Sequence, residues 1–302
     1  MNHFCTITTF SHLYKVYALA ESLKQGQNQF TLHVLVVDSN QKLVFENCKF
    51  WTLQSLNGAE TLDIISKKYN ADKDKLRWSL KSVFMKYVLL NKITDQIIYL
   101  DNDLFFYTDY QFLFDLLKTH TFLITPHHYK NDPKSDQNWL EANYRVGLFN
   151  AGFIGANYQA INTLQWWADC CAYRCEKSVF RGLFDDQKYL DLIPVMEEKA
   201  LILRHKGCNV AGWNMHLCKR ELVNQTVKIN GQDPIIFIHF NDTTVREIIT
   251  GNDHILTNYY REYIRVLRIY NQNLKEKDLL FTQPFSDKIK FRLWKFITEL
   301  GV

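Results

Sequence analysis

The sequence predicts an α/β protein whose mostly parallel central sheet is flanked by helices. Short apolar runs, each the size of a buried strand, alternate with helical apolar stripes over roughly the first 125 residues. One of these runs ends in two acidic residues spaced two positions apart, at the edge where open α/β sheets bind ligands. The chain has 302 residues, of which 47% are hydrophobic, so it can bury a large core.

The first segments predict a strand–helix–strand unit. Residues 4–8 form the first expected strand, and residues 32–37 form a continuous apolar strand that ends at Asp38. Between them lies a helix for which Ser11 is the expected N-cap. The apolar stripe of this helix consists of Leu13, Val16, Tyr17, Ala20 and Leu23.

The remaining elements follow the same alternation. Further strands or strand-like apolar segments are expected at 50–53, 97–100, 122–125, 149–154, 201–203 and 235–239. Further helices are expected at 59–69, 79–91, 159–175, 185–193 and 254–273. The chain contains no internal repeat, low-complexity segment or Pro/Gly-rich linker. We therefore expect one α/β domain with a helical C-terminal extension.

Charge and composition exclude several classes of protein. The formal net charge of +4 is compatible with a phosphorylated substrate or an anionic membrane surface. No basic run with interleaved aromatic residues precedes the C-terminus, which argues against nucleic-acid binding. Residues 1–30 lack the features of a secretory signal, and no apolar run reaches the ~18–20 residues of a membrane-spanning helix.

The seven cysteines form no C-x-x-C pair and are odd in number, which favours a reduced, cytoplasmic protein. A zinc site is an alternative to ordinary burial of these thiols. Its candidate ligands are Cys171, Cys175, His205, Cys208, His216 and Cys218.

The strand at 97–100 and the two acidic residues that follow it are the strongest functional signal. Asp101 and Asp103, at i and i+2 on an extended turn, can both face one divalent cation. Their hard oxygen atoms suit Mg²⁺ or Mn²⁺, and such a cation neutralises a diphosphate. His239 closes the apolar run 235–238, where its imidazole is a candidate third ligand or a buried structural residue.

Taken in order, these segments resemble the bacterial GT-A-fold nucleotide-sugar glycosyltransferases that are distantly similar to glycosyltransferase family 8. The resemblance covers roughly residues 4–245. It rests on residues 78–81, 99–103, 125–128, 149–153, 166–167, 186–188, 191–194, 209–214 and 237–240. It implies a GT-A catalytic domain at 1–250, followed by a helical C-terminal extension at 251–302.

The resemblance also implies an activity: transfer of a hexose-type sugar from a nucleotide diphosphate, most simply UDP, to a glycan or lipid-linked acceptor. Asp103 and His239 would bind Mn²⁺ or Mg²⁺ with both phosphates, and Asp101 would touch the metal or the ribose. Asp186 would bind a sugar hydroxyl, and Gln187 would lie beside the anomeric carbon. The family implies retention of anomeric configuration; if the enzyme inverts, Asp186 is the candidate base.

Other residues are expected around the donor. Thr8 and Asp38, at the ends of the first two strands, are candidates for the nucleoside. Lys81 stands where the family has a basic residue that reaches the substrate. The amide of Asn150 can donate to sugar hydroxyls, and Gly152 lets the backbone approach a ligand closely, although a plain β-turn is the alternative.

The acceptor side is expected at a second group of residues. His127 follows a strand through Pro126, and Trp213 and Asn214 offer an aromatic face and an amide for a pyranose. Burial of the tryptophan in the core is the alternative. Asp185 is expected to cap the helix at 185–193.

The chain departs from the family after His239. A small, flexible pair usually follows that histidine, whereas Asn241-Asp242 follows it here. This departure puts the conformation of the phosphate-binding loop in doubt and brings a further carboxylate near the metal.

Two other functional classes stay open. A haloacid-dehalogenase-like phosphatase also carries two such acids after an apolar strand, and a glycan- or nucleotide-sugar-binding module would lack catalysis. The C-terminal residues 288–297 mix basic and large apolar side chains, so they either lie at the inner face of an anionic membrane or dock on their own domain.

Overall fold

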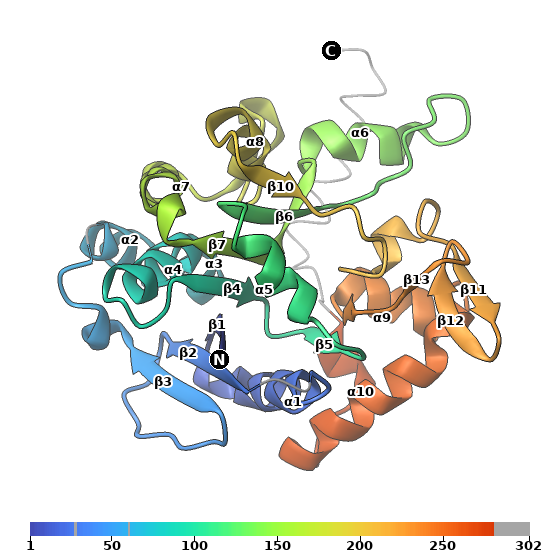
Figure 1. Cartoon of the computed structure of the whole chain (residues 1–302), viewed down its shortest axis with the longest axis horizontal. Helices are drawn as coiled ribbons and strands as arrows, with labels where there is room; N and C mark the ends of the chain where they lie inside the picture. Colours follow the sequence, from blue (N-terminus) through green and yellow to red (C-terminus); the bar gives the residue numbers. More distant parts are fainter. Residues whose placement is uncertain (27–28, 60, 281–302) are drawn as a thin grey trace.

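The computed structural model of the chain describes residues 1–26, 29–59 and 61–280 (Figure 1). A seven-stranded sheet with the order β10-β6-β7-β4-β1-β2-β3 forms its centre. Its strands are β1 (Asn2–Thr8), β2 (Phe30–Val36), β3 (Cys48–Thr52), β4 (Gln96–Leu100), β6 (Phe122–Pro126), β7 (Phe149–Asn157) and β10 (Ala200–Ile202). β7 runs antiparallel to its neighbours β4 and β6, and the other pairs are parallel, which confirms the mostly parallel sheet.

Helices cover both faces of this sheet. One core cluster joins the sheet to α4 (Lys81–Leu90) and α7 (Ile161–Tyr173), and a second joins it to α1 (Leu13–Leu23) and α5 (Gln111–Leu117). β4 shows why the strands are continuously apolar: alternate residues enter opposite clusters, so both faces are buried. The remaining helices are α2 (Leu62–Tyr69), α3 (Lys73–Ser79), α6 (Gln137–Arg145), α8 (Ile193–Met196), α9 (Asp242–Ile249) and α10 (Thr257–Tyr270).

A small second sheet joins the segment after the acidic turn to a strand from the C-terminal half of the chain. β5 (Leu104–Phe106) pairs antiparallel with β14 (Phe237–His239), and His239 lies opposite Leu104. Because Leu104 directly follows Asp103, this register places His239 next to the acidic turn, although the two are far apart in the sequence. β11 (Arg220–Val223), β12 (Thr226–Ile229) and β13 (Asp233–Pro234) form a separate three-stranded sheet, and β8 (Lys177–Ser178) pairs with β9 (Leu183–Phe184).

The C-terminal helices pack on the same body. Residues of α9 and α10 share a core cluster with Phe105 and Ile238, and the Tyr270 hydroxyl donates to Glu21 of α1 at 3.0 Å. Figure 1 shows α10 running alongside α1 below the central sheet. The basic and aromatic residues 288–297 lie outside the described part of the chain.

Two local predictions were wrong. Ser11 does not cap α1, because it lies inside a 3₁₀ turn (Phe10–His12) that precedes the helix. The predicted helix 185–193 is a 3₁₀ turn (Lys188–Leu192) followed by α8, so Asp185 is not its cap. Asp185 instead has a left-handed φ of 48° and pairs with Lys177 at 3.5 Å.

The zinc alternative receives no support from residues 1–26, 29–59 and 61–280, in which no cysteine joins a cluster of three metal-ligating side chains. All seven cysteines are free thiols. No helix in these ranges is both long enough and apolar enough to traverse a bilayer.

Candidate active site

The acidic turn lies where β4 ends and β5 begins. The Asp101 backbone N–H donates to the Gly152 carbonyl at 2.8 Å, and the Leu104 N–H donates to the Asp101 carbonyl at 3.2 Å. This turn and the β5–β14 pairing bring Asp101, Asp103 and His239 together, with one ligand atom of each within 4.8 Å of the others. His239 Nε2 lies 3.1 Å from an Asp103 carboxylate oxygen.

Asn209 holds the ring of His239. Its side-chain oxygen accepts from His239 Nδ1 at 3.2 Å, so Nε2 points toward Asp103, where a divalent cation could reach it. The Asn209 amide nitrogen donates to Thr125 at 2.9 Å and to Asn150 at 3.1 Å. Its φ of 62° places the backbone in the left-handed region, which asparagine tolerates better than most residues.

The residues present fit a divalent cation. Two carboxylates and an imidazole supply the hard oxygen and nitrogen ligands that Mn²⁺ or Mg²⁺ accepts. Gly152 leaves room for this cluster, since a Cβ at this position would lie 2.5 Å from His239 Cε1 and 2.9 Å from Asp101 Oδ2. Burial alone would raise the pKa of Asp103, but His239 and Lys15 outweigh it and hold that pKa below its usual range.

A buried lysine connects the acidic turn to the segment after β9. Lys81 Nζ lies 3.3 Å from Asp101 and 3.2 Å from Asp186, and it donates to the Ala151 carbonyl at 3.0 Å. Burial favours a lower pKa for Lys81, but the two carboxylates outweigh it and raise the pKa, so the lysine is charged. The Tyr99 hydroxyl also donates to Asp101 at 2.8 Å. Burial raises the pKa of Asp186 to about 6, although Lys81 opposes the shift.

Gln187 lies against β7. Its side-chain oxygen accepts from Asn150 at 3.2 Å and from the Ala151 N–H at 3.1 Å, and its nitrogen donates to the Val146 carbonyl at 3.3 Å. The neighbouring Asp186 carbonyl accepts from the Trp167 indole at 2.8 Å. These bonds fix residues 186–187 beside the metal-ligating cluster without any regular helix.

The predicted acceptor residues form a wall next to His239. The Trp213 ring lies 5.2 Å from the His239 ring and 5.7 Å from the His127 ring, both nearly perpendicular. Trp213 is buried, and its indole nitrogen has no hydrogen-bond partner among the residues that the structure describes. Burial lowers the pKa of His127 to about 3, and this histidine donates from Nδ1 to the Gly147 carbonyl at 2.9 Å.

Asn214 has a structural role. Its side chain accepts from the Ala211 N–H at 3.1 Å and donates to the Asn209 carbonyl at 2.9 Å. It therefore braces the residue that orients His239.

The two nucleoside candidates differ in position. Thr8 accepts from the Asn102 amide at 3.1 Å, which ties the end of β1 to the acidic turn. Asp38 is exposed, and it accepts from the Phe10 N–H at 2.7 Å. Asp38 thus shapes the loop after β1 but does not join the network around the acids.

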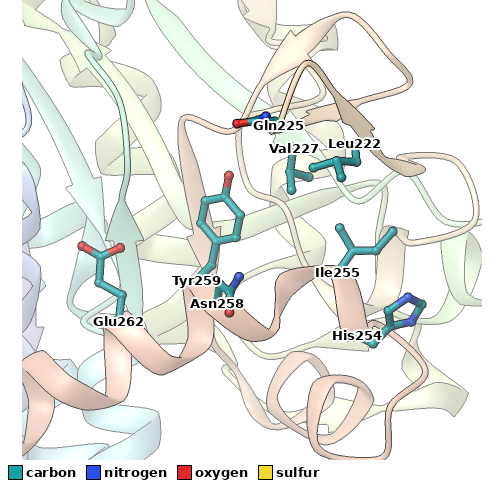
Figure 2. Close-up of a pocket in the computed structure, with 8 residues that line it drawn as sticks. All are labelled: Leu222, Gln225, Val227, His254, Ile255, Asn258, Tyr259 and Glu262. Carbon is teal, nitrogen blue, oxygen red and sulfur yellow. The ribbon is translucent and has the colours of Figure 1, made fainter.

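A cleft of about 460 Å³ opens beside the acids. It is lined by His12, Lys15, Asp74, Arg77, Trp78, Asp101, Asn102, Asp103, Lys177, Asn241 and Asp242. A groove of about 580 Å³ lies elsewhere, between the β11–β12 hairpin and α10, as Figure 2 shows, but its lining includes none of the predicted site residues. We place the candidate site in the smaller cleft because Asp101 and Asp103, two of the three candidate metal ligands, line it.

Sequence reasoning missed Lys15, Arg77 and Asn209 as individual site residues. Lys15 lies outside the apolar stripe of α1 and belongs to no recognisable motif, and Arg77 belongs to α3, which was not predicted. Asn209 lies in a segment that carries the family resemblance, and this was the one signal that could have singled it out.

No family model matches the chain. Two proteins of Bacillus subtilis strain 168, both called uncharacterized, are similar to it. YfnD is 28% identical over 271 residues, which are 86% of this chain and 82% of YfnD. YfnF is 26% identical over 247 residues, which are 79% of this chain and 80% of YfnF.

Solved structures of glycosyltransferases are similar in fold. The galactosyltransferase LgtC, in complex with donor and acceptor sugar analogs, has a TM-score of 0.58 and 11% identity, covering 95% of this chain and 99% of LgtC. GlyE of Streptococcus pneumoniae TIGR4 has a TM-score of 0.50 and 13% identity, covering 89% of this chain and 62% of GlyE. The chain therefore has the GT-A glycosyltransferase fold.

Proposed function

We propose that the protein is a metal-dependent glycosyltransferase that moves a hexose-type sugar from a UDP-sugar to a glycan or lipid-linked acceptor. The cluster of Asp101, Asp103 and His239 carries this proposal, because it offers metal ligands at the sheet edge where α/β folds bind ligands. The GT-A fold supports it, and so does the LgtC complex with donor and acceptor sugar analogs.

Asp101, Asp103 and His239 would hold Mn²⁺ or Mg²⁺. When bound, the ion supplies positive charge that stabilises the departing diphosphate. Asn209 keeps the His239 nitrogen directed at the site, and Tyr99 and Lys81 fix the Asp101 carboxylate. The site is thus held in position before a donor arrives, as electrostatic stabilisation of a leaving group requires.

During transfer, the bond between the anomeric carbon and the phosphate oxygen breaks and its electron pair stays on that oxygen. The acceptor hydroxyl oxygen forms the new bond to the anomeric carbon. Gln187 would lie beside that carbon, and Asp186 would bind a sugar hydroxyl. We favour retention, with the acceptor proton passing to the leaving phosphate oxygen, because Asp186 is buried in an ion pair with Lys81.

A thermal-shift panel of nucleotide sugars, with and without Mn²⁺, tests the proposal. A ligand at 100 times its Kd stabilises the folded state by about 2.7 kcal/mol, so a true donor raises the melting temperature clearly. We expect the shift for UDP-sugars only with Mn²⁺, and slow release of UDP when water replaces the acceptor. Binding without metal-dependent hydrolysis would indicate a binding module, and phosphate release from a generic phosphomonoester would indicate a phosphatase.

A further inference from the structure

The cleft beside Asp103 contains a cation that the site described so far does not use. Lys15 lies in the first turn of α1, is partly buried and lines the cleft. Within residues 1–26, 29–59 and 61–280 it forms no hydrogen bond or ion pair. Burial lowers the pKa of Lys15, and the Asp103 carboxylate opposes that shift.

The arginine and the other lysines nearby already have carboxylate partners. Lys81 pairs with Asp101 and Asp186, and Lys177 pairs with Asp185 at 3.5 Å. Arg77 pairs with Asp74 at 2.5 Å. Lys15 is therefore the lining lysine whose charge no neighbouring side chain binds directly.

A nucleotide-sugar donor would leave this site short of positive charge. The charges of Asp101 and Asp103 offset those of a divalent cation, and Lys81 offsets Asp186. The diphosphate then brings negative charges of its own, and it gains another when the sugar departs. Fixed positive charge facing that position would favour the transition state over the bound donor.

The segment after His239 does not supply that charge. Asn241 caps α9, with its side chain accepting from the Thr244 N–H at 3.0 Å. Asp242 follows, pairs with Arg246 at 3.1 Å and lines the cleft. This side of the cleft therefore contributes an acid and a helix N-terminus but no cationic lining residue.

We propose that Lys15 contacts the diphosphate of the donor and stabilises the charge that the leaving group gains. The inference rests on the proposed function and adds a residue from α1 to its site. Lys15 acts as a cation and keeps its proton, while the electron pair of the broken bond stays on the phosphate oxygen.

Lys15→Met tests the inference, because methionine keeps most of the aliphatic stem and removes the charge. With Mn²⁺ present, we expect the affinity for UDP to fall by about tenfold to a hundredfold, and the turnover of the UDP-sugar to fall as well. The affinity for uridine, which has no phosphate, should not change. Lys15→Arg should retain most of the UDP affinity.

Lys24→Met is the matched control. Lys24 lies at the opposite end of α1 and pairs with Glu21 and Glu46 on the surface. This variant loses the same charge from the same helix, and we expect wild-type affinity for UDP and wild-type turnover. Titration calorimetry and a UDP-release assay give both quantities.

The outcomes separate the inference from the proposed function. If the wild-type protein fails to bind UDP with Mn²⁺, the proposed function itself is wrong. If the wild type binds and turns over the donor, and Lys15→Met matches it within twofold, the inference is overturned. A Lys15→Met protein that loses uridine and UDP affinity equally also overturns it, and Lys15→Gln replaces this variant if it does not fold.

Discussion

Gly152 is surrounded by atoms of the metal-ligating cluster and of Asn150. A methyl group there would lie 2.5 Å from His239 Cε1 and 2.8 Å from the Asn150 side-chain oxygen. Gly152→Ala should therefore displace His239 and lower Mn²⁺-dependent UDP affinity at least tenfold, with an overpacking cost of about 1–3 kcal/mol. Titration calorimetry and urea unfolding measure the two effects.

Gly155→Ala is the control on the same strand. Its Cβ would meet Leu123 at 3.0 Å in the apolar core, so it should cost stability while leaving Mn²⁺-dependent UDP affinity unchanged. If Gly152→Ala binds UDP with wild-type affinity in the presence of Mn²⁺, the added methyl group does not displace His239 and the steric prediction is wrong.

Asp103 is a second residue whose substitution should weaken UDP binding far more than it affects folding. Its side chain lies at the acidic turn outside the hydrophobic clusters, so Asp103→Ala removes a proposed metal ligand without opening a core cavity. We expect this variant to lose transfer and the Mn²⁺-dependent part of UDP binding while remaining folded, with a small loss of stability because Asp103 pairs with His239. Asp115→Ala, which removes an exposed acid on α5, should behave as wild type. Wild-type turnover by Asp103→Ala in EDTA-treated buffer would rule out the metal assignment.

At the scale of elements, the segment from β9 to the following 3₁₀ turn is held by the strand and helix beside it. Gln187 bonds to β7, and Asp186 pairs with Lys81 of α4. We propose that both residues face the sugar of the donor and not its diphosphate. Asp186→Ala and Gln187→Ala should therefore lower turnover by a larger factor than they weaken UDP binding. Steady-state kinetics at saturating donor, set against UDP calorimetry, checks this. A loss confined to UDP affinity would move both residues away from the reacting centre.

Strands were predictable from the sequence because burial on both faces makes them continuous apolar runs. β4 is the clearest case, since Ile97 and Tyr99 enter one core cluster while Ile98 and Leu100 enter the other. The charged helix α3 was not predicted, because Lys73–Ser79 has only Leu76 as a buried apolar residue. The segment 185–193 was wrongly predicted to be a helix because acidic residues are typical of a helix N-terminus, whereas Asp185 adopts a left-handed conformation.

The candidate site was likewise predictable from the sequence only in part. Asp101 and Asp103 lie between the apolar strands β4 and β5, and His239 ends β14, which pairs with β5, so their convergence follows from strand pairing. Lys15 reaches the site only because α1 packs beside the acidic turn. Asn209 reaches it only because its own backbone is in the left-handed conformation. No periodicity in the sequence encodes such contacts, since they depend on how separate elements are placed.

For the whole molecule, buried and half-buried histidines predict loss of stability in acid. Burial lowers the pKa of His33 and His127 to about 3 and that of His128 to about 4, from a usual value of 6.5. Between these values the unfolded chain binds more protons than the folded one, so the free energy of unfolding should fall as the pH drops from 7 to 4. Urea unfolding at several pH values measures this slope.

His128→Asn provides the control for that slope. Asparagine tolerates the φ of 54° at this position, so the backbone is kept and one titrating group is removed. The variant should lose less stability between pH 7 and pH 4 than the wild type does. An unchanged slope would show that His128 is protonated as easily in the folded state as in the unfolded one.

The C-terminal segment leads to a last prediction, for the complete chain. Residues 288–297 alternate basic with large apolar side chains, and we propose that they contact an anionic membrane surface, where a lipid-linked acceptor would be presented. Each basic residue near such a surface contributes about 1 kcal/mol, and salt weakens that attraction. We expect the full chain to sediment with phosphatidylglycerol vesicles at low salt, and less so at high salt. The variant Lys288→Gln/Lys290→Gln/Arg292→Gln/Lys295→Gln should lose sedimentation but keep UDP-sugar hydrolysis.

The matched control replaces four exposed lysines elsewhere on the surface. Replacing Lys42, Lys92, Lys134 and Lys199 with Gln removes the same net charge from other parts of the surface. If sedimentation depends on net charge alone, both variants will lose it equally, and the segment then has no special role. If the full chain ignores the vesicles at low salt, or the C-terminal variant unfolds at lower urea than the control does, the segment packs on the protein. Sedimentation lost only in the C-terminal variant, with hydrolysis unchanged, is the result that supports a membrane contact separate from the catalytic site.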